Sequence, residues 1–271
     1  MSDCTHDCGS CSKDCSSRSL IVEQNKLSDI KKVIAVVSGK GGVGKSLVTS
    51  LLAVGKAKEG KAVGVLDADI TGPSIPRAFG IYGGVEGDSN GIYPRQSDFG
   101  VRVVSSNLLL DDETDPVIWR GPVIAGMVKQ FWTDCVWNDV DYMYVDMPPG
   151  TGDVPLTAFQ SLHVEGIIVV TSPQELVSMI VAKAVKMANM MHIPVLGVVE
   201  NMSYVKCPDC GKEFSVFGES KVDEVATNFD LKLLGRIPFD VDIAKACDRG
   251  DIESVDARWL ESAVEAVKRL K

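Results

Sequence analysis

Short runs of branched apolar residues alternate with longer stretches at helical spacing, from Lys32 almost to the end of the chain. Runs of Val and Ile without interleaved polar residues are typical of strands buried on both faces, as in parallel sheets. Their alternation with helices indicates repeated βαβ units, with helices on both faces of a mostly parallel sheet. The predicted strands are Val33–Val37, Ala62–Leu66, Tyr142–Val145, Gly166–Thr171, Pro194–Val199 and Lys232–Arg236.

Two segments depart from this alternation. Between Ile81 and Val104 several glycines and the run Val101–Val104 predict a hairpin or an edge strand. From Ile252 to Leu270 apolar residues recur at helical spacing and form one stripe. A helix on a membrane surface is one interpretation of the stripe. Its polar face mixes acidic and basic side chains, whereas lipid-binding helices are usually basic, so we expect it to pack on the core.

The first 30 residues differ in composition from the rest of the chain. They are rich in Ser, Asp and Cys and hold too few apolar residues to fold alone. We therefore predict two parts, a flexible Cys-rich tail over residues 1–30 that a metal would order, and a folded domain over residues 31–271. The folded domain carries a C-x-x-C insert at residues 207–210.

Composition and charge narrow the class of protein. The 271 residues are 45% hydrophobic, which is enough for one large α/β domain. The formal net charge of −9 argues against a nucleic-acid groove, which needs clustered Lys and Arg. No apolar run approaches the roughly 18 residues of a membrane span, and no basic-then-apolar leader is present. We expect a cytoplasmic protein with neither nucleic acid nor membrane as partner.

The segment Gly39–Ser46 reads Gly-Lys-Gly-Gly-Val-Gly-Lys-Ser between the first predicted strand and a helical run. This is the context that the phosphate-binding motif G-x-x-x-x-G-K-[ST] requires, so the fold class is an α/β P-loop NTPase that binds ATP and Mg²⁺. Lys45 would reach the β and γ phosphates, and Ser46 would ligate Mg²⁺. The predicted nucleotide-binding residues here are Gly39, Lys40, Gly41, Gly42, Val43, Gly44, Lys45, Ser46 and Leu47.

Three aspartates follow predicted strands. Asp67 and Asp69 follow the second strand, and Asp146 precedes a loop, Met147–Asp153, rich in Pro and Gly. Open parallel sheets bind ligands at the carboxyl ends of their strands, so Asp69 and Asp146 are expected to face the phosphates. The loop after Asp146 can act as a switch. A helix cap or turn explains Asp67 equally well.

From about residue 30 to 270 the chain resembles the Mrp/ApbC branch of the deviant Walker A ATPases, relatives of MinD and the nitrogenase iron protein. The early loop lysine, Lys40, is that class's signature lysine, which reaches the nucleotide across a dimer interface; within one chain it could instead be a solvated loop lysine. The resemblance implies that Asp69 positions the attacking water and that Asp146 holds Mg²⁺ through its shell. The catalytic set that it implies is Lys40, Lys45, Asp69 and Asp146.

The same resemblance extends to the second half of the chain. It implies that Asn201 bonds the adenine and that Arg236–Asp240, including Pro238 and Asp240, closes over the base. Trp119–Pro122 also resembles a family motif, but its residues indicate no role, and a packed aromatic beside a helix start explains them as well.

Eight cysteines in a chain without a recognisable secretory signal are typical of thiolate ligands or buried thiols. Cys135 and Cys247 lie in apolar helical surroundings, as core thiols do. In the resembling family, Cys207 and Cys210 distinguish cluster carriers from MinD-like proteins. A four-iron cluster takes four thiolates, so a two-fold dimer would assemble one [4Fe-4S] cluster on its axis. A zinc knuckle closed by two tail cysteines is the alternative.

The tail carries four cysteines in the spacing C-x3-C-x2-C-x3-C. Four thiolates suffice for one metal site, so we expect metal binding here, with iron preferred to zinc, rather than a merely oxidisable tail. The spacing differs from that of eukaryotic scaffold relatives and of bacterial ferredoxins. His6 is a substitute ligand or, more simply, a solvated histidine. The predicted tail ligands are Cys4, Cys8, Cys11 and Cys15.

These features together predict a homodimeric ATPase that carries a labile iron–sulphur cluster to apo recipient proteins. The resemblance implies slow turnover that a partner stimulates. One alternative is a MinD- or ParA-like positioning ATPase with structural zinc, against which the absence of a basic surface helix counts. Another is an ATP-driven electron donor like the nitrogenase iron protein.

Overall fold

The structure is a computed structural model that describes residues 21–70, 72–110, 121–150, 152–173 and 177–270. Several residues singled out in the sequence lie outside these ranges, so their predicted roles stay predictions. They are Cys4, His6, Cys8, Cys11, Cys15, Trp119 and Arg120.

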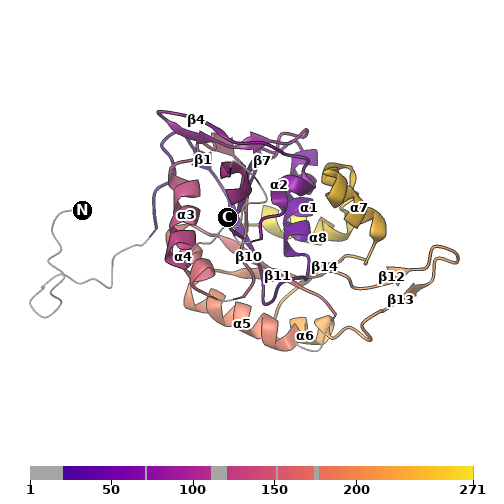
Figure 1. The fold of residues 1–271 in the computed structure, drawn as a ribbon. Coiled ribbons are helices and arrows are strands. Elements are labelled where there is room, and N and C mark those ends of the chain that lie inside the picture. Colours follow the sequence, from indigo (N-terminus) through magenta and orange to yellow (C-terminus); the bar gives the residue numbers. More distant parts are fainter. Residues whose placement is uncertain (1–20, 71, 111–120, 151, 174–176, 271) are drawn as a thin grey trace, which may run out of the picture.

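An eight-stranded sheet forms the centre of the molecule, in the order β14-β11-β10-β2-β9-β3-β7-β6 (Figure 1). Every pair of neighbours is parallel except β6 and β7. All six predicted strands are present, each within one residue of its predicted ends. The strands are β2 (Val33–Ser38), β3 (Val63–Asp67), β6 (Arg95–Gln96), β7 (Arg102–Val104), β9 (Tyr142–Asp146), β10 (Gly166–Thr171), β11 (Val195–Glu200) and β14 (Leu233–Arg236).

Helices cover both faces of the sheet, as predicted for a P-loop NTPase fold (Figure 1). Successive residues of a strand point to opposite faces, so Ala35 and Val37 enter one core while Ile34 and Val36 enter the other. The first core packs under α3 (Gly121–Thr133), α4 (Asp153–Ser161), α5 (Val177–Met190) and α6 (Val222–Asn228). The second packs under α1 (Lys45–Lys58), α2 (Ile75–Ala78), α7 (Val241–Arg249) and α8 (Glu261–Lys268).

The irregular stretch before Val104 forms the hairpin and edge strand that its glycines predict. Strand β4 (Glu86–Asp88) pairs antiparallel with β5 (Gly91–Tyr93), and β6 and β7 continue the main sheet to its edge. The edge strand β6 has only two residues, which limits the exposed edge of the sheet.

The folded domain begins earlier than the predicted boundary at residue 31. Strand β1 (Asp29–Ile30) pairs with β8 (Asp139–Val140), and the Trp132 indole Nε1 donates to the Val22 carbonyl at 3.1 Å. Val22 also packs against the first core. Residues 22–30 therefore belong to the packed domain, because their few apolar side chains and backbone groups find partners on it.

The C-terminal stripe packs on the second core, as expected, but it is not one helix. It consists of two 3₁₀ turns, η3 (Ile252–Ser254) and η4 (Arg258–Leu260), followed by α8. The backbone is extended at Val255, and the Asp256 carboxylate accepts from the Arg258 backbone N–H at 3.0 Å, which forms a turn. The prediction of continuous helical spacing was wrong here because successive short turns bury the same stripe.

Candidate functional site

The loop Gly39–Ser46 joins β2 to α1 at the carboxyl edge of the sheet and borders a cavity of about 370 Å³. Gly42 and Gly44 both have φ of 79°, in the left-handed region that favours glycine. Helix α1 begins at Lys45, so its unpaired N–H groups and the positive end of its dipole face the cavity. Such a cradle suits an anion such as a polyphosphate.

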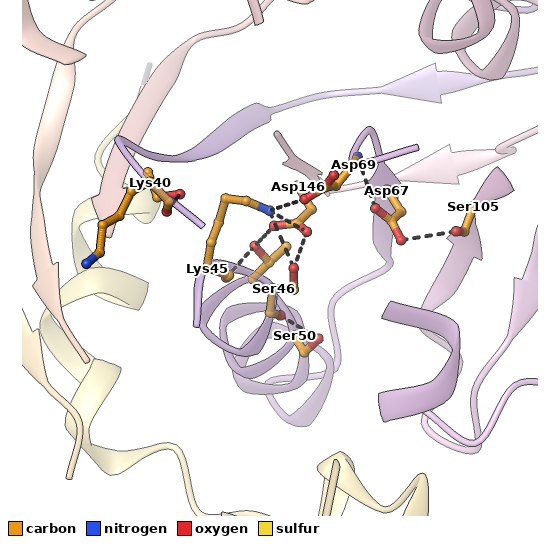
Figure 2. Close-up of polar contacts among 10 residues, drawn as sticks. Lys40, Lys45, Ser46, Ser50, Asp67, Asp69, Ser105 and Asp146 are labelled. Atoms are coloured by element: carbon orange, nitrogen blue, oxygen red, sulfur yellow. Dashed lines mark hydrogen bonds and ion pairs between the residues drawn. The ribbon is translucent and has the colours of Figure 1, made fainter. Parts of the chain in front are cut away.

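Lys45 and Asp146 form a buried ion pair at the base of this cavity (Figure 2). The Lys45 Nζ lies 2.7 Å from Asp146 Oδ2 and 3.9 Å from Asp69 Oδ2. The Ser46 hydroxyl donates to Asp146 Oδ2 at 2.6 Å, and the Thr49 hydroxyl donates to Oδ1 at 2.7 Å. The structure thus brings together four of the residues that the sequence placed at the phosphates.

These oxygen donors fit the predicted magnesium ion. Mg²⁺ prefers hard oxygen ligands and is usually held by one or two protein groups beside substrate phosphates and water. The Ser46 hydroxyl and the Asp146 carboxylate offer that donor set next to the phosphate cradle. Ser46 would ligate the ion directly, and Asp146 would orient its shell.

Asp67 lies beside Asp146 in the pairing of β3 with β9, and it is fully buried. Its Oδ2 accepts from the Ser105 hydroxyl at 3.0 Å, and its Oδ1 accepts from the Asp69 backbone N–H at 3.2 Å (Figure 2). Burial, and after it the charge of Asp146, raise the pKa of the Asp67 carboxyl to about 8. Asp67 therefore supports the turn that presents Asp69, as one of its two interpretations proposed.

Lys40 borders the same cavity but extends away from the ion pair. Figure 2 shows its side chain directed away from Lys45 and Asp146. The backbone beneath it is fixed, because the Ser38 hydroxyl donates to the Lys40 carbonyl at 3.0 Å. The predicted role of Lys40 across a dimer interface stays a prediction.

The residues predicted to surround the adenine lie in two separate places. The Asn201 amide donates to the Val43 carbonyl at 2.9 Å, so Asn201 braces the phosphate loop itself. Pro238 and Asp240 instead border a second hollow beside Cys207, and Asp240 caps α7 by accepting from the Asp242 N–H at 2.8 Å. Their predicted roles at the adenine stay predictions.

Cys207 and Cys210 lie at the tip of a hairpin made of β12 (Val205–Lys206) and β13 (Glu213–Phe214). Figure 1 shows this hairpin projecting away from the sheet. Cys210 is exposed and Cys207 half-buried. Backbone N–H groups of Cys210 and Asp209 donate toward the Cys207 sulphur and lower the pKa of its thiol, which favours the thiolate.

The cysteine pair offers two thiolates. Within the described ranges no group of three or more His, Cys, Asp or Glu side chains is arranged to hold a metal ion. Of the two lone cysteines, Cys135 is fully buried as predicted, and burial raises its thiol pKa to about 12. Cys247 is half-buried and borders the phosphate cavity, so its description as a core thiol was incomplete.

Three polar contacts of the site were not predicted from the sequence, those of Thr49, of Ser105 and of Asn201 with Val43. Thr49 lies one turn after Lys45 on α1, a spacing that could have identified it. Ser105 and the contact of Asn201 with Val43 depend on the order of strands in the sheet, which no local motif encodes.

Comparison with known proteins places these features in a family. The family described as ParA, NUBPL iron-transfer P-loop NTPase, matches residues 29–270. The chain belongs to this NUBPL iron-transfer NTPase family. An iron-sulfur cluster carrier protein of Clostridium perfringens is 46% identical over 91% of this chain and 90% of its own length. One of Methanocaldococcus jannaschii is 40% identical over 100% of this chain and 97% of its own.

Two solved structures have a similar fold. A nucleotide-binding protein of Archaeoglobus fulgidus, in complex with ADP, has 44% identity and a TM-score of 0.78, covering 86% of this chain and 91% of its own. The septum site-determining protein MinD of Pyrococcus horikoshii, at 19% identity and a TM-score of 0.59, covers 89% and 97% and shares the fold alone. Within the described ranges, no helix is both long and apolar enough to cross a membrane.

Proposed function

We propose that the protein is an ATP-hydrolysing carrier that assembles a [4Fe-4S] cluster between two copies of the chain and transfers it to apo recipient proteins. One observation carries the proposal: Cys207 and Cys210 lie on a hairpin that projects from an NTPase domain, and they supply half of the thiolates that a four-iron cluster takes. The names of the relatives, iron-sulfur cluster carrier proteins, support it.

The cluster would be labile, because each chain contributes only two of its ligands. A two-fold axis through the hairpin tips would bring four thiolates together, and opening the dimer would expose the cluster to a recipient. The hydrogen bonds that lower the pKa of the Cys207 thiol favour the ligating thiolate and also a rapid exchange of ligands with an acceptor.

In the nucleotide site, Lys45 would neutralise the β and γ phosphates and Asp69 would orient the attacking water. Magnesium, once bound, supplies further charge neutralisation at the phosphates. By the family resemblance, Lys40 of a second copy would complete the site, so an isolated chain would turn over slowly. The cytoplasmic location, the absence of nucleic-acid and membrane partners and the tail cluster stay predictions from the sequence.

Anaerobic reconstitution with iron and sulphide tests this function. We compare wild type, Cys207→Ser/Cys210→Ser and the tail variant Cys4→Ser/Cys8→Ser by metal analysis, Mössbauer spectroscopy and transfer to an apo four-iron protein. Wild type and the tail variant should deliver clusters, while the hairpin variant should deliver none and still bind ATP. Tight zinc without a cluster, or transfer by the hairpin variant, would refute the proposal.

A further inference from the structure

Glu200 is a fully buried carboxylate at the end of β11 that fastens both ends of the cysteine hairpin. Its Oε2 accepts from the Ser203 hydroxyl at 2.5 Å, where the chain leaves the sheet. Its Oε1 accepts from the Ser220 hydroxyl, just before α6 begins. A buried charge is costly unless it is compensated, and here the two hydroxyls and Arg236, whose Nε lies 3.6 Å from Oε2, provide the compensation.

Backbone bonds fix the same junction to the neighbouring strand. The Ile237 N–H donates to the Glu200 carbonyl and the Ser203 N–H donates to the Ile237 carbonyl, both at 2.9 Å. The Phe239 N–H then donates to the Tyr204 carbonyl at 2.8 Å. Inside the fold the base of the hairpin is thus held firmly, and Glu200 is the side chain that joins its two ends.

The next residue along the chain, Asn201, contacts the phosphate loop. Its amide donates to the Val43 carbonyl, and a Cβ at Gly44 would lie only 2.1 Å from its Nδ2. Any shift of the Val43–Gly44 backbone on binding phosphate must therefore move Asn201. Met202, which follows it, has φ of 57°, an unusual conformation for a residue other than glycine. The segment between loop and hairpin is short and has little freedom to absorb that shift.

We infer that Glu200 is a positioning residue that couples nucleotide occupancy of the phosphate loop to the placement of Cys207 and Cys210. The Asn201 amide receives the displacement, and the Glu200 carboxylate passes it to Ser203 and Ser220 together, so that the hairpin moves as one unit. The inference rests on the proposed function, in which these cysteines hold the cargo, and it assigns the route by which ATP reaches them.

Cysteine alkylation measures this coupling without any cluster. The reduced, cluster-free full chain is treated with iodoacetamide in the absence of nucleotide, with Mg²⁺–ADP and with a non-hydrolysable ATP analogue, and peptide mass spectrometry gives the rates at Cys207 and Cys210. In wild type we expect the ATP analogue to change the rates at least about threefold. The exposed Glu219, next to Ser220, provides the matched control, and Glu219→Ala should behave as wild type.

Glu200→Ala and Ser220→Ala should lose this response, with changes below about 1.5-fold, while nucleotide affinity stays within about twofold of wild type. Glu200→Gln should recover part of it, because an amide can still bond both hydroxyls. If Glu200→Ala does not fold, Ser220→Ala and Ser203→Ala decide the question. A full response in the variants, or none in wild type, would overturn the inference.

The two proposals fail separately. If wild type loads a cluster but nucleotide does not change the alkylation rates of the two thiols, the coupling is refuted and the carrier function stands. If nucleotide changes the alkylation rates but no cluster binds, Glu200 remains a positioning residue and the carrier function is refuted.

Discussion

Asp67 and Asp146 are neighbouring buried carboxylates that differ in the polar groups around them. Asp146 has an ammonium and two hydroxyls around it, from Lys45, Ser46 and Thr49. Asp67 has a hydroxyl and a backbone N–H, and its pKa is raised to about 8 by burial and by Asp146. Asp67 is therefore mainly neutral up to about pH 8, beside the Asp146 carboxylate that belongs to the phosphate site.

This difference predicts a pH dependence of stability in the nucleotide-free protein. In the unfolded chain Asp67 ionises near pH 4, whereas in the folded chain it keeps its proton to about pH 8. Its contribution to the free energy of unfolding is thus complete below pH 4 and is lost as the pH rises to 8, at up to about 1.4 kcal/mol per pH unit.

Urea unfolding between pH 5 and 8 checks this prediction. Asp67→Asn should flatten the decline that wild type shows, because an amide does not titrate. The exposed Asp98 serves as a control, and Asp98→Asn should follow wild type. Parallel curves for wild type and Asp67→Asn would show that Asp67 is ionised in the folded protein.

Lys45 should be needed for stability as well as for nucleotide binding. Lys45→Met leaves Asp146 buried and unpaired, which typically costs about 3–5 kcal/mol. The double variant Lys45→Met/Asp146→Asn removes both charges and should regain most of that loss without regaining ATP affinity. Denaturant unfolding and calorimetric titration separate the two effects; a single variant as stable as wild type would contradict the ion pair.

At the scale of elements, the sequence predicted the repeated units well because their signals are local. Runs such as Gly166–Thr171 and the motif before α1 each lie within one segment and its flanks. The C-terminal stripe was misread as one helix, since periodicity reports which side is buried and not whether the backbone is continuous. Contacts such as Ser105 with Asp67 depend on which strands become neighbours, and that order is a property of the whole sheet.

The two loop glycines should differ in their tolerance of a side chain. Both have φ of 79°, so alanine at either costs about 1–2 kcal/mol in backbone conformation. A Cβ at Gly42 has nothing within 4 Å, whereas at Gly44 it would displace the Asn201 amide. Gly44→Ala should therefore destabilise the nucleotide-free protein by about 1 kcal/mol more than Gly42→Ala. Equal midpoints in thermal unfolding would place Asn201 away from the loop.

At the scale of the whole molecule, the proposed cargo should act as the contact between two copies. Each chain has a mass of 29.1 kDa and a net charge of −9, so like charge opposes association of the empty protein. Loading with iron and sulphide should convert the chain to a species of about twice that mass, and chelation should reverse the change. Anaerobic light scattering after gel filtration gives the masses. A loaded monomer would show that one chain supplies all the ligands.

The hairpin between Ser203 and Ser220 leaves the domain and returns to it at a single carboxylate. Its length and residues can therefore change without altering the register of the eight-stranded sheet. Other metal-binding segments inserted between the two serines would be anchored by the same Glu200 carboxylate and joined to the same nucleotide site. In this architecture the ligands for the cargo are separable from the fold, and the Glu200 carboxylate with its two serines is the part that an altered hairpin would have to keep.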